Sequence, residues 1–257
     1  MSTLDVLPVP FARDNYLWLI HDGRHAALVD PGEAAPALAA LEKDALTPVA
    51  VLLTHHHGDH IGGVPGLLAR HPGLPVYGPR AEDIAGVDHP VSDGDSIALA
   101  ALGLELAVLN VAAHTCGHLA YCGGGMLFCG DALFSAGCGR LFEGTPTDLE
   151  RALTRLAALD GSTKVYCGHE YTLANLAFAR AVEPENAARD RYAARCETLR
   201  AQGLPTLPST IELEKAVNPF LRPGAAGIVA SVAAHSGTPP ASARACLAAL
   251  RAWKDTF

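Results

Sequence analysis

The chain has 257 residues, of which 49% are hydrophobic and 18% are charged. That length accommodates one large domain, or a domain with a modest extension, and the composition excludes an intrinsically disordered chain. The formal net charge of −8 at pH 7 provides no overall positive field for nucleic acid or for an anionic membrane. We therefore expect neither of these as a partner.

The sequence shows no secretory signal and no membrane-spanning segment. Its first residues lack a basic stretch followed by an apolar one, and the longest apolar stretch, residues 97–113, contains Glu105 and Asn110. The seven cysteines do not follow the spacing of a small disulfide-rich domain, which favours free thiols in a reducing compartment. We expect a cytoplasmic monomer.

Short apolar strands separated by turns dominate the first two thirds of the chain, with a few helices between them. The predicted strands cover residues 16–20, 26–29, 49–53, 97–100, 104–111, 126–129 and 164–167. Apolar residues at helical spacing predict helices over 34–43 and 147–159. Thr147 and Glu150 have the spacing of a capping box, which would begin the second helix.

The composition changes near residue 170. From there the chain is rich in Ala, Arg and Glu, has helical periodicity and contains almost no β-branched runs. Ser209 and Glu212 form a second expected capping box, and two adjacent prolines precede a last helix that ends near Lys254. The sequence therefore predicts an α/β domain over residues 1–168 and an all-helical domain over residues 169–257.

The most specific motif is a histidine cluster directly after the predicted strand 49–53. It reads Thr54-His55-His56-His57-Gly58-Asp59-His60. Imidazole nitrogens suit zinc and iron, and a carboxylate can complete or bridge a metal shell. So dense a cluster of such groups at a strand end is difficult to explain by core packing, and it predicts a metal site.

Three more residues of ligand type follow predicted strands. His114 comes after the strand 104–111, whereas Asp131 and His169 each follow a Cys-Gly pair at the end of a strand. Glycine permits close approach of the backbone at these points. Because strand ends at one edge of a sheet can converge, the set supplies enough donors for two metal shells.

The spacing His55-x-His57-x-Asp59-His60, with His114, Asp131 and His169 at these separations, resembles the metallo-β-lactamase superfamily. That resemblance implies a four-layer αββα sandwich with a binuclear metal centre. It implies that His55, His57 and His114 hold one metal and that Asp59, His60 and His169 hold the other. Asp131 would bridge the two, and Asp59 and Asp131 are the expected catalytic carboxylates.

Other residues near the motif have different expected roles. Asp30 would orient a ligand histidine from outside the metal shell. His56 lies between ligands and should face away, because adjacent residues of an extended segment point to opposite sides. Cys138 and Cys167 are expected to be packing residues. The histidines without a motif are expected on the surface or in the core: His21, His25, His71, His89, His118 and His235.

Finer features resemble the glyoxalase II branch, the hydroxyacylglutathione hydrolases, over essentially the whole chain. They lie at residues 14–16, 29–32, 136–145, 167–172, 218–222 and 251–255. The resemblance implies glutathione contacts from Arg140, Phe142, Tyr171, Arg251 and Lys254, of which the last two would take the glycine carboxylate. Some members have lysine at the position of Arg140 and tyrosine at the position of Phe142. Arginine keeps the charge but changes its geometry, and phenylalanine lacks the hydroxyl donor of tyrosine. Arg222 is expected to be a structural ion-pair partner.

The resemblance implies an enzyme that hydrolyses S-(2-hydroxyacyl)glutathione thioesters in methylglyoxal detoxification. S-D-lactoylglutathione would give glutathione and D-lactate by attack of a hydroxide that bridges two divalent ions, zinc being expected and iron or manganese the alternatives. Two other classes stay open. A glutathione persulfide dioxygenase would use a single iron and lack the helical domain, and a metal-binding module without catalysis would have lost ligands. Metal stoichiometry separates the hydrolase from the dioxygenase.

Overall fold

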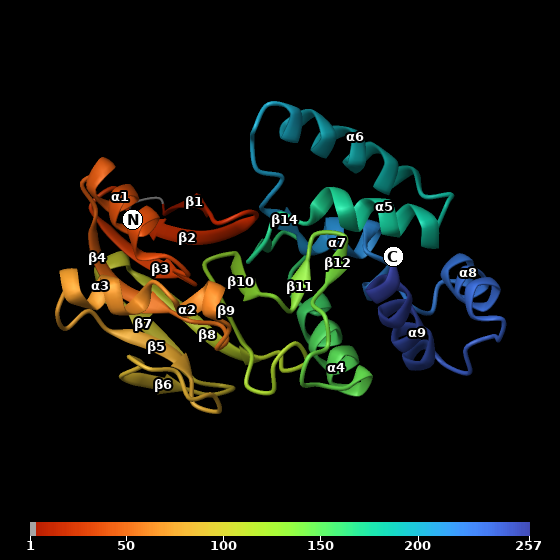
Figure 1. The fold of residues 1–257 in the computed structure, drawn as a ribbon, viewed down its shortest axis with the longest axis horizontal. Coiled ribbons are helices and arrows are strands. Elements are labelled where there is room, and N and C mark those ends of the chain that lie inside the picture. Colours follow the sequence, from red (N-terminus) through yellow and green to blue (C-terminus); the bar gives the residue numbers. More distant parts are fainter. Residues whose placement is uncertain (1–3) are drawn as a thin grey trace.

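The computed structural model describes residues 4–257, and two six-stranded sheets form its centre (Figure 1). The first sheet has its strands in chain order, and the strands of the second are ordered β14-β13-β10-β9-β8-β7. The first contains β1 (Asp5–Phe11), β2 (Asn15–His21), β3 (His25–Val29), β4 (Thr47–Leu52), β5 (Val76–Pro79) and β6 (His89–Val91). The second contains β7 (Ser96–Leu99), β8 (Leu104–Asn110), β9 (Leu119–Gly123), β10 (Met126–Gly130), β13 (Lys164–Cys167) and β14 (Ser209–Thr210).

The main hydrophobic core lies between the two sheets, and β8 shows how a strand contributes to it. On β8, Leu104, Leu106 and Val108 are buried, whereas the residues between them are exposed. They pack in one cluster with Trp18 and Ile20 of β2. The opposite face of the first sheet packs in a second cluster against two helices, α1 (Ala34–Lys43) and α3 (Val64–Arg70). Sheet on sheet with helices outside gives the expected αββα layers.

Helix α4 (Pro146–Ala157) packs in the same core cluster as the second sheet. The helices of the C-terminal third of the chain gather at one end of the molecule (Figure 1): α5 (Thr172–Val182), α6 (Ala187–Ala201), α7 (Ile211–Val217), α8 (Ala226–Ser236) and α9 (Ala243–Thr256). Shorter elements are α2 (Gly58–Ile61), the 3₁₀ turns η1 (Ala100–Leu102) and η2 (Pro219–Leu221), and the hairpin β11 (Leu133–Phe134) with β12 (Gly137–Cys138). Within residues 4–257, no helix is both long and apolar enough to cross a bilayer.

The strand ends bring the ligand-type residues together. His55 follows β4, Asp131 follows β10 and His169 follows β13, and β10 and β13 are parallel neighbours. The two sheets are joined at this edge, because Tyr16 N donates to Gly168 O at 2.8 Å and Leu119 N donates to Thr54 O at 2.9 Å. The loops after these strands therefore meet in one place.

Both expected capping boxes are wrong in position. Helix α4 begins two residues earlier than expected at its cap: Thr145 N donates to Asp148 Oδ2 at 3.0 Å, and Asp148 N donates to Thr145 Oγ1 at 3.3 Å. Pro146 explains the shift, because its fixed φ suits the first helical position. Helix α7 is capped by Thr210, whose hydroxyl accepts from Leu213 N, whereas Ser209 belongs to β14.

Several strands were not expected from the sequence. They are β1, β5, β6, β9, β14 and the hairpin of β11 and β12. β1 contains two prolines and lies at a sheet edge, where the absent N–H groups cost no ladder bond. The others have two to five residues, too short for an alternating pattern to emerge.

The Thr145 cap yields a stability prediction. Thr145→Ala should lower the free energy of unfolding by about 1 kcal/mol, because the Asp148 amide then loses its acceptor. Thr147→Ala, in the first turn of the same helix, should change it by less than about 0.5 kcal/mol. Urea denaturation of the two variants measures the difference. A larger loss for Thr147→Ala would contradict the observed cap.

Candidate metal centre and adjoining pocket

Three histidine nitrogens converge at the first group of donors. His55 Nε2 lies 3.1 Å from His57 Nδ1, and His114 Nε2 lies 3.0 Å from the same nitrogen. Four-coordinate zinc with Zn–N distances of about 2.0–2.1 Å would separate such nitrogens by roughly 3.3 Å. Burial, together with His60 and His118, holds the pKa of His55 well below its ordinary value. His55 is therefore neutral, which is the form that binds a metal.

Asp59, His60 and His169 form the second group. His169 Nε2 lies 3.4 Å from Asp59 Oδ2, and His60 Nε2 lies 3.9 Å from the same oxygen. His60 and His169 are buried, whereas Asp59 is exposed to the adjoining pocket. Asp59 and His60 come from the short helix α2 that follows β4, and His169 comes from the loop after β13, so the group spans both sheets.

Asp131 stands between the two groups. Its Oδ1 lies 3.4 Å from His60 Nε2, and its Oδ2 lies 3.5 Å from His114 Nε2 and 3.4 Å from His169 Nε2. Burial raises the pKa of Asp131, but the adjacent His60 and His169 outweigh this effect and hold it well below its ordinary value. Asp131 is therefore an ionised carboxylate that faces donors of both groups.

Two buried atoms in this cluster have no hydrogen-bond partner among residues 4–257: His60 Nε2 and Asp131 Oδ1. Burial lowers the pKa of His60, but Asp131 and Asp30 raise it well above its ordinary value, so the surroundings stabilise positive charge at this point. Buried polar atoms without partners are rare in native proteins. The nitrogen and carboxylate donors, the free atoms and the preference for positive charge all fit divalent metal ions.

Partners outside the cluster fix the orientation of His60. Its Nδ1 lies 3.0 Å from Asp30 Oδ2, and Asp30 also accepts from Thr54 N at 2.8 Å and Thr54 Oγ1 at 2.7 Å. A carboxylate on Nδ1 leaves Nε2 free for a metal. Gly168 permits the close packing here, because a Cβ on it would lie 2.6 Å from both Asp131 Oδ1 and His60 Cε1.

His169 and Asp59 are held by the residues that begin β2. Asp14 Oδ1 lies 3.0 Å from His169 Nδ1, and Asn15 donates to Asp59 Oδ2 at 3.0 Å. No role for Asp14 or Asn15 follows from the sequence motif that contains them. Their contacts join them to residues 155 and 44 positions away, respectively, so a local pattern could not assign those roles.

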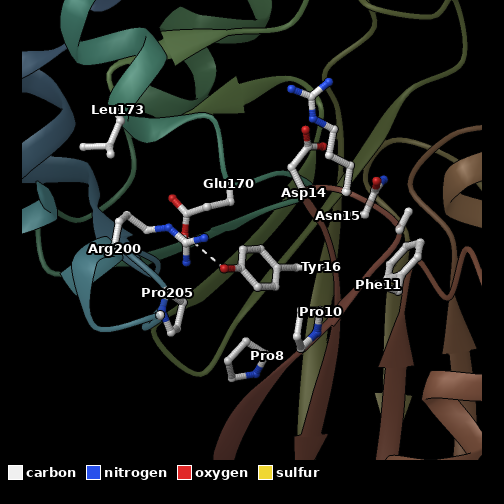
Figure 2. A pocket seen from close by; sticks show the side chains of 13 residues that line it. Pro8, Pro10, Phe11, Asp14, Asn15, Tyr16, Glu170, Leu173, Arg200 and Pro205 are labelled. Carbon is white, nitrogen blue, oxygen red and sulfur yellow. Dashed lines mark hydrogen bonds and ion pairs between the residues drawn. The ribbon is translucent and has the colours of Figure 1, made fainter.

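Asp14 and Asn15 also line a cavity of about 370 Å³ (Figure 2). Figure 2 shows Tyr16 pointing toward Glu170, with Arg200 beside them. Tyr16 donates to Glu170 Oε2 at 3.0 Å, and Thr206 N donates to the same oxygen at 2.8 Å. Glu170 directly follows His169, so these bonds tie the ligand loop to the chain beyond α6. Three of the potential metal donors, His57, His114 and Asp131, line a different cavity.

His114 and Asp131 have their own supporting contacts. His114 Nδ1 lies 2.8 Å from the Arg140 carbonyl, so it is the donor and Nε2 is free. The Asp131 amide donates to His118 Nε2 at 3.2 Å, and the His118 ring stacks on His55. Burial, with a contribution from His114, lowers the pKa of His118 to about 3, so His118 accepts this bond in its neutral form. Sequence reasoning left His118 without a role.

A cavity of about 710 Å³ opens on the potential metal donors. Its lining includes all five residues that were expected to contact substrate: Arg140, Phe142, Tyr171, Arg251 and Lys254. The Tyr171 ring stacks on His169, with ring centres 4.7 Å apart. Burial, with Asp14 and Asp131, raises the pKa of Tyr171 to about 12, so its hydroxyl is a donor at neutral pH. The exposed Phe142 ring lies 5.2 Å from that of His114.

The two C-terminal cations occupy different surroundings. Arg251 is buried, and its Nη1 donates to the Cys138 carbonyl at 2.8 Å while Nη2 pairs with Asp255 at 3.1 Å. Its Nε is buried and has no partner within residues 4–257. Lys254 is partly exposed, and its Nζ lies 5.3 Å from the centre of the Phe178 ring. Most of the Arg251 guanidinium is therefore used within the protein, whereas Lys254 remains accessible.

His56 is turned toward two glutamates. Its Nδ1 lies 3.1 Å from Glu82 Oε2 and its Nε2 lies 3.3 Å from Glu143 Oε1. It is absent from the three groups of potential metal donors found in residues 4–257.

Arg222 forms a bidentate ion pair with Glu183, at 2.6 and 3.0 Å. This pair agrees with the structural role expected for Arg222.

Residues 12–169 match the family described as Metallo-beta-lactamase superfamily, and residues 170–257 match that described as Hydroxyacylglutathione hydrolase C-terminus. The B3 metallo-beta-lactamase BLEG-1 is similar in fold, with a TM-score of 0.65 at 24% identity over 84% of this chain and 99% of that one. A di-iron-bound form of TTHA1623 has a TM-score of 0.60 at 26% identity, covering 83% of this chain and 99% of that one.

The curated relatives match over the whole chain. The hydroxyacylglutathione hydrolase of Cupriavidus taiwanensis is 53% identical and covers 99% of both chains, and that of Photobacterium profundum is 50% identical, covering 99% of this chain and 100% of its own. These matches include the helical C-terminal region as well as the two sheets. The chain belongs to the hydroxyacylglutathione hydrolase family, within the metallo-β-lactamase superfamily.

Proposed function

We propose that this chain hydrolyses S-(2-hydroxyacyl)glutathione thioesters, with S-D-lactoylglutathione giving glutathione and D-lactate. The observation that carries the proposal is the 710 Å³ cavity, in which metal donors meet a wall containing Arg140, Tyr171 and Lys254. Ligand pockets of this size accommodate molecules as large as a tripeptide thioester. The full-length relatives named hydroxyacylglutathione hydrolase support the same activity.

We further propose two divalent ions per chain, zinc being the expected metal and iron or manganese the alternatives. His55, His57 and His114 would hold one ion, Asp59, His60 and His169 the other, and Asp131 would contact both. Bound there, the ions supply an electrophile for the thioester carbonyl and lower the pKa of water toward about 7. The di-iron form of TTHA1623 supports a count of two.

Hydrogen bonds within the protein orient the proposed metal donors. The outer hydrogen bonds from Asp30, Asp14 and the Arg140 carbonyl set the tautomers of His60, His169 and His114. Water adds to the carbonyl carbon, the C–S bond breaks, and the products are a carboxylate and the glutathione thiol. A thiolate leaves readily, so no side chain has to act as a general acid.

Glutathione would lie along the cavity wall away from the metal donors. The Tyr171 hydroxyl can donate to the peptide, and the ammonium of Lys254 can receive the glycine carboxylate. Arg251 lines the same wall, and its positive charge would add to that of Lys254, although its Nη1 and Nη2 are committed to Cys138 and Asp255. We propose that residues 1–168 form the catalytic domain and that residues 169–257 provide much of this wall.

A persulfide dioxygenase with a single iron is the alternative function. The match of residues 170–257 to the hydroxyacylglutathione hydrolase C-terminus supports the hydrolase instead. The test compares glutathione release from S-D-lactoylglutathione with oxygen consumption on glutathione persulfide, using metal-quantified protein. Oxygen consumption without thioester hydrolysis would overturn the proposal.

Replacing Asp131 tests the carboxylate between the two donor groups. Asp131→Asn should reduce metal occupancy and lower kcat by about two orders of magnitude or more, because one neutral amide replaces a charge shared by both groups. Metal analysis and steady-state kinetics measure both effects. Retention of two ions and near-parental kcat would show that Asp131 is no ligand.

Adjacent histidines provide a matched pair. His57→Ala should deplete one metal site, because His57 Nδ1 lies between His55 and His114. His56→Ala should leave metal content unchanged, because His56 pairs with Glu82 and Glu143. Equal metal loss in the two variants, measured after identical dialysis, would contradict this division.

The C-terminal cations should behave differently from each other. Lys254→Ala should raise KM for S-D-lactoylglutathione about 10- to 150-fold with little change in kcat, because one charge-assisted contact of roughly 1.5–3 kcal/mol is lost. Arg251→Ala should also lower kcat, because Arg251 supports the Cys138 carbonyl. A short acyl thioester without the tripeptide should be insensitive to Lys254→Ala. An unchanged KM for the glutathione substrate would remove Lys254 from the binding site.

A further inference from the structure

Side chains of the helical C-terminal region form hydrogen bonds with the backbone of each residue from 134 to 139. This segment connects Asp131 to Arg140 and includes most of the hairpin formed by β11 and β12. Every one of its six residues has a backbone group bonded to a side chain of the helical region. The contacts are Asn218 to the carbonyls of Phe134 (3.3 Å) and Gly137 (2.9 Å), Asn175 to that of Ser135 (3.1 Å), Glu214 to the amide of Ala136 (2.8 Å), and Arg251 to the carbonyls of Cys138 (2.8 Å) and Gly139 (3.4 Å).

Glu214 is the centre of these contacts. Its side chain is fully buried, and its carboxylate accepts from Ala136 N, from Ser135 Oγ at 2.9 Å and from Asn218 Nδ2 at 3.1 Å. Ala136 has a φ of +55°, a conformation that a residue with a Cβ adopts rarely. The bond from its amide to Glu214 therefore stabilises a backbone shape that the segment would not adopt on its own.

The hairpin contributes little stability by itself. Only two residue pairs, Leu133 with Cys138 and Phe134 with Gly137, make up its ladder, and an isolated two-stranded hairpin is marginal in water. Gly137 also lets Asn175 approach, because a Cβ there would lie 2.6 Å from the Asn175 Cγ atom. The position of the segment therefore depends on the helical side chains.

The segment matters because both of its ends reach the site. The Phe134 ring lies 5.2 Å from the ring of Tyr171 and 5.9 Å from that of His169. At the other end, the Arg140 carbonyl accepts from His114 Nδ1 at 2.8 Å. A displaced segment would therefore change the wall of the cavity and remove the partner that orients a metal donor.

We propose that Glu214 is a positioning residue for the thioester hydrolase. By fixing residues 134–139, it sets the Arg140 carbonyl against His114 and the Phe134 ring against Tyr171. Glu214 touches neither substrate nor metal donors and acts through the segment. The expected change in kcat and KM rests on the proposed function, whereas the expected change in zinc affinity does not depend on the substrate.

The test compares Glu214→Leu with Glu214→Gln. Leucine leaves the Ala136 amide without an acceptor. Glutamine keeps one oxygen for Ala136 and Asn218, and its amide can donate to Ser135, whose hydroxyl can turn to Tyr192, 2.9 Å away. Three quantities are measured: zinc affinity by competition with a chelator, amide hydrogen exchange of the peptide containing Ala136, and kcat and KM for S-D-lactoylglutathione at saturating zinc.

Glu214→Leu should weaken zinc binding about 10- to 100-fold, the range found when outer partners of metal ligands are removed. It should also speed exchange in residues 134–139 and raise KM at least severalfold, and Glu214→Gln should restore all three to within about threefold of the parent. If Glu214→Leu does not fold, Asn218→Ala, which frees the carbonyls of Phe134 and Gly137, should shift zinc affinity in the same direction.

The matched control is Arg222→Gln, which breaks the ion pair with Glu183 inside the helical region; within residues 4–257 the Arg222 side chain makes no hydrogen bond to residues 134–139. It should reduce thermal stability but leave zinc affinity unchanged. Parental zinc affinity in Glu214→Leu, or an equal loss in Arg222→Gln, would overturn the proposal. Absence of thioester hydrolysis by the parent would instead contradict the proposed function and leave the zinc and exchange results to decide the role of Glu214.

Discussion

Five imidazoles and two carboxylates face one another at the edge shared by the two sheets, and most of them are buried. Lone pairs and negative charges brought together in a poorly solvated place repel one another unless positive charge lies between them. Protonation of His60 between Asp30 and Asp131 supplies only part of this positive charge, because the low pKa of His55 keeps that ring neutral. Divalent ions supply it fully, so the architecture around the site is best understood as support for cations.

That support has two origins. Within the sheets, strand ends deliver His55, Asp131 and His169 to one edge, and buried partners such as Asp30 set their orientation. The C-terminal helices add a second layer of support, because their side chains hold the segment that runs from the hairpin to Arg140. The helical region therefore does more than line the substrate cavity. It shapes the loop on which His114 depends.

Hydrophobic periodicity is a local signal, and it predicted the helical C-terminal region; the placement of ligand-type residues after strands predicted their convergence. The αββα layers were predicted only by the resemblance to the metallo-β-lactamase superfamily. The sequence placed the start of α4 at Thr147, since the competing cap at Thr145 depends on the intervening proline. It assigned no role to Asp14, His118 or Glu214. Their contacts join residues that are distant in the chain, and only the folded structure reveals such pairs. Arg251 was expected to bind substrate, but its exact surroundings depend on the path of residues 138–139.

If this cluster binds two divalent ions, thioester hydrolysis should require both. The decisive measurement titrates metal-stripped protein with zinc and follows bound metal and S-D-lactoylglutathione hydrolysis in the same samples. Hydrolysis should reach its maximum only as bound zinc approaches two ions per chain. Full activity with a single bound ion, or saturation of binding at one, would contradict this expectation.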